Sequence, residues 1–281
     1  MIAVRTDGKP LSIGHVALHE ITVPVDAGIV FLFSQGWRKG LYYDLKPLVR
    51  PEFPARQYDL EKLCGQFFAY VKFQHLFKVT DVEWDALIAQ KWFPFVSLKN
   101  ETIKSIINYV RNGCDIDEIT ESIASELTNI LPSILKNLRR NPLFGSHLPL
   151  FEQAIDRYLA GDYISTASIV YPRIEGLMRT YLSSSGKSVK RTSKHLVKSV
   201  IEARANDLHH FGGLLPNNFQ RYLKEVYFAN FDPQHPDVLS RHSVAHGVAP
   251  AHDFSLKAAT IGLLIRDQLS FYLRPQDNEN S

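Results

Sequence analysis

The sequence has few cysteines, no long apolar run and little net charge, and each shortage excludes a class of protein. Its two cysteines, Cys64 and Cys114, are far apart and form no CxxC pair, so we expect neither a disulfide framework nor a cysteine zinc site. The apolar run from Ala27 to Phe33 is too short to span a bilayer, and no charged leader precedes it. We therefore expect a cytoplasmic protein in a reducing compartment, with no membrane partner.

A net charge of +3 over 281 residues does not by itself indicate nucleic-acid binding, because such binding depends on local clusters of cations. Hydrophobic residues make up 45% of the chain and charged residues 22%, which is typical of a packed globular protein. The length predicts two regions. We place them at 1–145 and 146–275, followed by a disordered polar tail at 276–281.

The N-terminal region has the pattern of short strands. Apolar segments between about residues 13 and 48 are separated by turn-forming residues at 26–28 and 35–40, which predicts hairpins of a small antiparallel sheet. Three prolines, at positions 47, 51 and 54, are expected to end this sheet.

From residue 58 onward the apolar spacing is that of helices, so the fold class is mainly α. A joint is expected at about 140–147, where Pro142 and Gly145 interrupt the pattern. Helices are predicted near residues 58–77, 81–91, 97–111, 115–138, 147–160, 162–183, 190–208, 216–228, 237–247 and 253–273.

Glu175 is the first residue that points to chemistry. It lies at the edge of an apolar stripe on the 162–183 helix, between Tyr171 and Met178. A carboxylate beside a buried seam needs a cationic or hydrogen-bonding partner to offset its desolvation. Two interpretations remain open: a functional pairing elsewhere, or a structural pair with Arg179 one turn away.

The second feature is the segment Arg241-His242-Ser243-Val244-Ala245-His246-Gly247, in which Gly247 is the expected helix C-cap. On a helix, His242 and His246 share one face, whereas Arg241 and His246 point about 140° apart and would flank a groove. A guanidinium can hold a phosphate, and an imidazole can transfer protons at neutral pH. This combination suits phosphodiester chemistry.

The motif resembles that of HEPN domains, which are helical bundles and in many cases metal-independent endoribonucleases. Arg241, the polar His242, and His246 with Gly247 match the family pattern, although the polar position is often Asn in the family. The helix at Tyr171–Leu182 resembles the family's first long helix, and LKAATIGLLIRDQLSFYL resembles its closing helix. The resemblance covers about residues 150–275 and leaves the first half of the chain unexplained.

The resemblance implies a mechanism in which the 2′-hydroxyl of RNA attacks the adjacent phosphorus, with no cofactor and no metal. It implies that His246 is the general acid or base, that Arg241 stabilises the developing charge, that His242 assists, and that Glu175 positions Arg241. It also implies a homodimer with a composite site. A role in phage defence or as a toxin, with an antitoxin or regulatory protein as partner, is a further expectation.

A basic run between residues 187 and 204 is the candidate RNA-binding face. Six cations accompany a single acid there, and the expected phosphate contacts are Lys187, Lys190, Arg191 and Lys194. Judged alone, this run is equally consistent with a solvated helix face.

Three other interpretations compete with the ribonuclease. His242 and His246 have the spacing of helical metal ligands, and with His235 and His252 they could serve a metal-dependent hydrolase, although no glutamate follows His242 as in zincins. A HEPN-like fold could instead be a catalytically inactive nucleotide-binding or protein-interaction module. In a wholly structural interpretation, Arg241 forms a surface pair and His246 is a satisfied core histidine.

Overall fold

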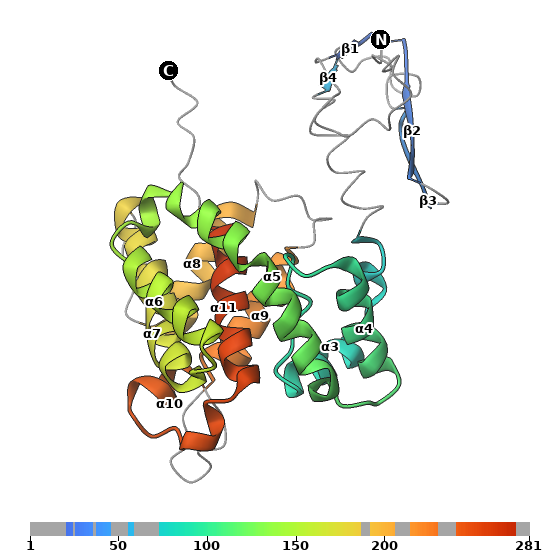
Figure 1. Cartoon of the computed structure of the whole chain (residues 1–281). Helices are drawn as coiled ribbons and strands as arrows, with labels where there is room; N and C mark the ends of the chain where they lie inside the picture. The colour runs from blue at the N-terminus through green and yellow to red at the C-terminus, as the bar shows by residue number, and fades with distance from the viewer. Residues whose placement is uncertain are drawn as a thin grey trace, which may run out of the picture. The chain divides into compact units, whose positions relative to one another are not determined.

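The computed structural model describes residues 21–24, 26–35, 38–45, 56–58, 73–186, 192–205, 214–229 and 240–273 (Figure 1). These residues belong to two units: one contains the strands and the residues up to 78, and the other contains everything described from residue 79 onward. The chain is mainly helical, with small antiparallel sheet elements near its N-terminus, and this confirms the predicted fold class. The expected tail at 276–281 lies outside the described residues.

The first unit contains two short antiparallel pairings. Strands β2 (Ile29–Gln35) and β3 (Arg38–Asp44) form a hairpin in which Val30 lies opposite Tyr43 and Leu32 opposite Leu41. These four apolar side chains are exposed. Strand β1 (Ile21–Val23) pairs with β4 (Arg56–Tyr58).

The pairing of β1 with β4 corrects two predictions. The turn at 26–28 was expected to join β1 to β2 as a hairpin, yet among the described residues these two strands are not paired. The sheet was expected to end at the prolines, yet strand pairing resumes at Arg56 and extends to Tyr58, the first residue of the predicted 58–77 helix. The physical reason is that β1 pairs with a strand that is distant in the sequence, and the turn residues next to β1 carry no information about such a partner. Of that predicted helix, residues 59–72 lie outside the described residues.

The second unit is a set of helices whose positions follow the predicted ranges closely. They are α3 (Asp81–Ala89), α4 (Asn100–Arg111), α5 (Thr120–Arg139), α6 (Leu148–Leu159), α7 (Tyr163–Ser184), α8 (Ser193–Ala205), α9 (Pro216–Tyr222), α10 (Arg241–Ala245) and α11 (Leu256–Ser270). Shorter turns also occur, namely η2 (Leu76–Lys78) in the first unit and η3 (Ile116–Ile119), η4 (Pro142–Phe144), the π-helical η5 (Leu223–Tyr227) and η6 (Ala251–Asp253) in the second. The predicted joint at 140–147 is the η4 turn between α5 and α6, inside this unit.

Helix α11 is at the centre of the second unit. Every residue from Ala258 to Leu269 is buried, as expected for a helix that is enclosed on all sides. It packs against both α5 and α7 (Figure 1). At Gly262 the Tyr171 ring of α7 packs directly against the backbone of α11, because an added Cβ atom would lie 2.9 Å from that ring. The central position of α11 fixes α7, which carries Glu175.

Local sequence signals explain where the helices begin. Thr80 caps α3 in a reciprocal capping box with Glu83, and the Asp162 carboxylate accepts a hydrogen bond from the Ser165 amide at the start of α7. Helix α7 continues through Pro172. None of the helices in the described part of the chain is long and apolar enough to cross a membrane.

Candidate active site

Helix α10 carries the Arg-His motif and is held by caps at both ends. The Ser240 side chain accepts from the Ser243 amide, and the Ser243 hydroxyl accepts from the Ser240 amide, so the two serines form a capping box. Both serines are almost fully buried. A five-residue helix is too short to be stable alone. These caps, together with packing against α7, therefore hold the motif in place.

The C-terminal end of α10 is a Schellman motif. Gly247 has φ +67°, and its amide donates to the Val244 carbonyl, while the Val248 amide donates to the Ser243 carbonyl. Glycine suits this position because its backbone adopts the left-handed region without a Cβ penalty. Gly247 thus ends the helix directly after His246 and leaves that imidazole on an exposed turn.

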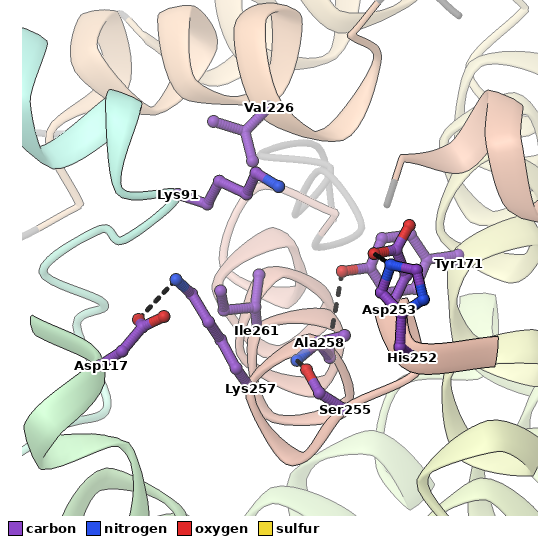
Figure 2. Close-up of a pocket in the computed structure, with 10 residues that line it drawn as sticks. All are labelled: Lys91, Asp117, Tyr171, Val226, His252, Asp253, Ser255, Lys257, Ala258 and Ile261. Atoms are coloured by element: carbon purple, nitrogen blue, oxygen red, sulfur yellow. Dashed lines mark hydrogen bonds and ion pairs between the residues drawn. The ribbon is translucent and has the colours of Figure 1, made fainter. Parts of the chain in front are cut away.

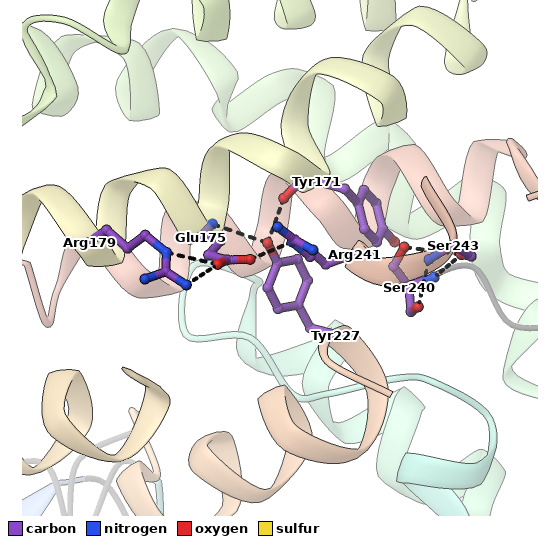
Figure 3. A network of polar contacts seen from close by, with 7 residues as sticks. All are labelled: Tyr171, Glu175, Arg179, Tyr227, Ser240, Arg241 and Ser243. Carbon is purple, nitrogen blue, oxygen red and sulfur yellow. Dashed lines mark hydrogen bonds and ion pairs between the residues drawn. The ribbon is translucent and has the colours of Figure 1, made fainter. Parts of the chain in front are cut away.

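Glu175 lies at the centre of a buried charge cluster. One carboxylate oxygen accepts from Arg179 Nε and Nη2 at 2.8 and 2.6 Å, and the other forms an ion pair with Arg241 Nε (Figure 3). The Glu175 side chain is 9% exposed, against 37% for Arg179 and 25% for Arg241. The structural pair and the contact with the motif, which the sequence left as alternatives, therefore coexist. Because two arginines share one carboxylate, the cluster retains one net positive charge.

Tyr227 contacts the backbone of α7 beside this cluster. Its hydroxyl accepts from the Glu175 amide at 3.1 Å and donates to the Tyr171 carbonyl, so it sits inside the i to i+4 ladder of α7 (Figure 3). The ring is fully buried and comes from the π-helical turn η5, a distortion that often occurs at functional sites. Burial, followed by the charge of Glu175, raises the pKa of Tyr227 well above its usual range. The hydroxyl therefore keeps its proton.

His242 and His246 stack on one another. Their ring centroids are 6.3 Å apart and their planes differ by 7°, and His242 also lies 6.2 Å from the Phe228 ring. Burial, and then the neighbouring charge of Arg241, lower the pKa of His242 below its usual value. His242 is consequently neutral at pH 7 and can accept a proton. His246 is exposed at the end of the helix.

Most of the predicted phosphate contacts lie outside the described residues. Lys187, Lys190 and Arg191 are outside the described residues, and Lys194 belongs to α8 without a described side chain. Further along α8, Lys198 pairs with Glu202 at 3.7 Å.

Of the predicted metal ligands, His242, His246 and His252 lie within the described residues and His235 does not. Within the described ranges, no group of three His, Cys, Asp or Glu side chains could hold a metal ion. His235 lies outside those ranges, and His252 contacts Asp253 with Nε2 and Oδ1 3.5 Å apart.

Sequence reasoning missed Tyr227 as part of the site. Tyr227 follows Val226 in an apolar segment, and the helical pattern marks it only as a core residue. No local signal could have identified it, because its hydroxyl acts on a helix more than fifty residues earlier.

No protein-family model matches the chain, and no curated protein or solved structure is similar to it. The function must therefore be inferred from the site itself.

Proposed function

We propose that the protein is a metal-independent endoribonuclease with its active site on α10. The observation that carries the proposal is the net positive cluster of Arg241, Glu175 and Arg179 directly beside two stacked imidazoles. The excess cation favours binding of an anion such as a phosphodiester. The imidazoles supply the proton transfer that cleavage requires.

Each residue has a distinct role in this proposal. The RNA 2′-hydroxyl attacks the adjacent phosphorus, the bond to the 5′-oxygen breaks, and the products are a 2′,3′-cyclic phosphate and a 5′-hydroxyl. The exposed His246 takes the proton of the 2′-hydroxyl and delivers a proton to the leaving 5′-oxygen, and Arg241 stabilises charge on the pentavalent phosphorane. Because a guanidinium has five N–H donors, pairing with Glu175 through Nε is compatible with phosphate binding through the Nη groups. Glu175 fixes Arg241, and neutral His242 assists.

The proposal includes a dimer and further partners. A twofold axis beside α10 would bring two Arg241-His246 pairs together in one composite site. The excess positive charges of the two clusters would repel each other until an anion binds between them. The run Lys187, Lys190, Arg191 and Lys194 would hold RNA phosphates. Restraint by an antitoxin, in a toxin or phage-defence role, belongs to the same proposal.

The test is incubation of the purified protein with total RNA in EDTA, followed by end-group analysis. We expect cleavage with cyclic-phosphate and 5′-hydroxyl ends. His246→Ala and Arg241→Lys should each lower the rate by at least about 10²-fold, the loss typical of a positioned acid-base group or charge stabiliser.

A matched control separates chemistry from folding. Arg139→Lys changes an exposed arginine of α5, away from the proposed RNA-binding run, and should retain full activity. Strict dependence on Mg²⁺ or 5′-phosphate products would overturn the mechanism. Folded, fully active His246→Ala and Arg241→Lys proteins would favour the structural interpretation, and RNA binding without any cleavage would favour an inactive module. Activity that remains complete in a monomer, measured by ultracentrifugation over a dilution series, would exclude the composite site.

A further inference from the structure

A pocket of about 200 Å³ lies beside the candidate site and is not explained by the motif (Figure 2). Lys91 and Lys257 lie on one side of it, and His252 and Asp253 lie on the other. Tyr171 lies on the same side as Asp253, and its hydroxyl donates to the Ala258 carbonyl at 3.3 Å. The walls come from the turn that follows α3, from η3, α7, η5 and η6, and from α11, which are all parts of the second unit.

The charges that line the pocket argue against a bare phosphate as its ligand. Lys91 and Lys257 are balanced by Asp117, which forms an ion pair with Lys257, and by Asp253. A doubly negative phosphate would gain nothing from a lining with no net charge. A neutral molecule that has hydrogen-bond acceptors on one edge and donors on another matches the lining better.

Asp253 provides the acceptor side. Its side chain is 13% exposed, and its Oδ2 atom is buried without a hydrogen-bond donor in the described part of the chain. Buried carboxylate oxygens are nearly always hydrogen-bonded, so this one can take a donor from a ligand. The opposite wall carries Lys91, whose φ of 62° belongs to the Schellman motif that ends α3, in which the Lys91 amide donates to the Ile88 carbonyl.

The pocket volume fits a planar heterocycle. It exceeds the roughly 150 Å³ cavity that accommodates benzene, and it is smaller than the roughly 300 Å³ at which pockets for drug-sized ligands begin. The exposed His252 imidazole at the rim can stack on such a ring, as aromatic side chains do on unpaired RNA bases.

The pocket adjoins the arginine cluster through α7. Tyr171 lines the pocket, and Glu175 lies one turn further on the same face, which corresponds to about 6 Å along the helix axis. Tyr227 contacts both residues, through the Tyr171 carbonyl and the Glu175 amide. This spacing is comparable with that between a base and the neighbouring phosphate of a single strand.

We propose that this pocket is a base subsite that binds a guanine of the RNA next to the phosphate held by Arg241. Guanine presents two adjacent donors, N1–H and the N2 amino group, to the Asp253 carboxylate, and its O6 and N7 acceptors face the lysine ammoniums. No other standard base offers a carboxylate two adjacent donors. The proposal rests on the ribonuclease function, because that function supplies the substrate.

The first measurement is the affinity for free nucleotides by isothermal titration, with GMP, AMP, CMP and UMP as probes. We expect GMP to bind at least about tenfold more tightly than the other three, the margin that one charged hydrogen bond provides. Asp253→Asn should abolish this preference, because it replaces an acceptor with a donor. Asp156→Asn, which changes an exposed aspartate of α6, should leave the preference intact.

A second measurement needs no variant. GMP, but not AMP, should protect Lys91 of the wild-type protein from acetylation, as detected by mass spectrometry. Equal affinity for the four nucleotides, an unchanged preference in Asp253→Asn, or equal protection by AMP would each overturn the subsite.

The cleavage pattern distinguishes failure of the subsite from failure of the proposed function. Cleavage that occurs without guanine at a fixed position, and that Asp253→Asn does not alter, would overturn the subsite and leave the ribonuclease. Selective GMP binding by a protein that cleaves no RNA would leave a guanine pocket and overturn its role in RNA cleavage.

Discussion

Two regions of the second unit bury a charged side chain, and they stabilise it in opposite ways. The Glu175 carboxylate has two arginine partners. The Arg266 guanidinium on α11 is 1% exposed, and none of its nitrogen atoms has a hydrogen-bond partner within the described residues. It lies instead over the rings of Phe151 and Phe144, at 4.5 and 5.5 Å from their centroids.

This difference separates a cluster suited to function from one that serves packing. Burial lowers the pKa of Arg266 to about 9 against the opposing charge of Asp267, so the guanidinium remains charged at pH 7 beside two aromatic faces and without a hydrogen-bond partner in the described residues. No ligand can approach it, because it is enclosed in the core. Arg241 is partly exposed, and its cluster has an uncompensated charge, so it can exchange solvent for an anion. Four substitutions test this comparison, from the largest expected effect to the smallest.

The largest effect is expected for Glu175→Gln. The substitution keeps the shape of the side chain and removes the one acidic partner that Arg179 and Arg241 have among the described residues. Breaking a buried ion pair from one side leaves charge uncompensated, so the free energy of unfolding should fall by about 3 kcal/mol. Urea denaturation measures this. Glu152→Gln is the matched control, because Glu152 pairs with Arg139 at the surface and should contribute less than about 1 kcal/mol. Equal losses in the two variants would show that the cluster is an ordinary surface pair.

Tyr227→Phe should have the next largest effect. It removes the hydroxyl that joins the Tyr171 carbonyl and the Glu175 amide, so the free energy of unfolding should fall by about 1 kcal/mol. If Tyr227 positions Glu175, the variant should also weaken RNA binding. Tyr163→Phe, at the start of α7, removes a hydroxyl with no hydrogen-bond partner in the described ranges and provides the control. A Tyr227→Phe protein with unchanged stability would mean that α7 closes its own ladder without the tyrosine.

Arg266→Met should change stability little, and in either direction. Replacement of a buried charge by an apolar side chain of similar volume is often neutral or stabilising, and methionine retains favourable contacts with the two phenylalanine rings. We expect a change within about 1 kcal/mol in the same urea experiment. A loss as large as that of Glu175→Gln would contradict the comparison, because it would show that the aromatic faces and Asp267 stabilise the Arg266 cation as strongly as two arginines stabilise Glu175.

Sequence reasoning succeeds here where the information is local. Helices α7 and α11 begin and end within a few residues of their predicted positions, because Asp162 and Ser255 provide N-caps next to periodic apolar residues. The position of Glu175 beside a buried seam implied that it needs a cationic partner. Arg179, one helical turn away, was a candidate for that partner and forms the pair. The roles that the sequence assigns to Arg241 and His246 in catalysis stay predictions.

Sequence reasoning fails where two interacting residues are distant in the chain. The pairing of β1 with β4 is set by chain closure, and the wedge of Tyr227 into α7 depends on two helices that meet only in the folded core. The pocket combines Lys91, Asp253 and Lys257 from separate elements, and none of them has a motif around it. Pairwise proximity of this kind leaves no signature in a single sequence.

The smallest effect concerns the pH dependence of stability near His242. Burial, and then Arg241, lower the pKa of His242 in the folded protein, so below the usual histidine pKa of about 6.5 the unfolded chain binds more protons at this position than the folded one. The free energy of unfolding should therefore decrease as pH falls through the region just below 6.5, and His242→Gln should remove that part of the decrease. The measurement is urea denaturation of both proteins at pH 7.5 and 5.5.

The pKa of His147 is also lowered by burial, but His147 is present in both proteins and its contribution cancels in the difference between them. Because Glu175 acts in the opposite direction on His242, the decrease should be steeper in a Glu175→Gln background. Equal pH dependence with and without His242 would mean that its imidazole is fully solvated, and the neutral, partly buried histidine would then have no place beside Arg241.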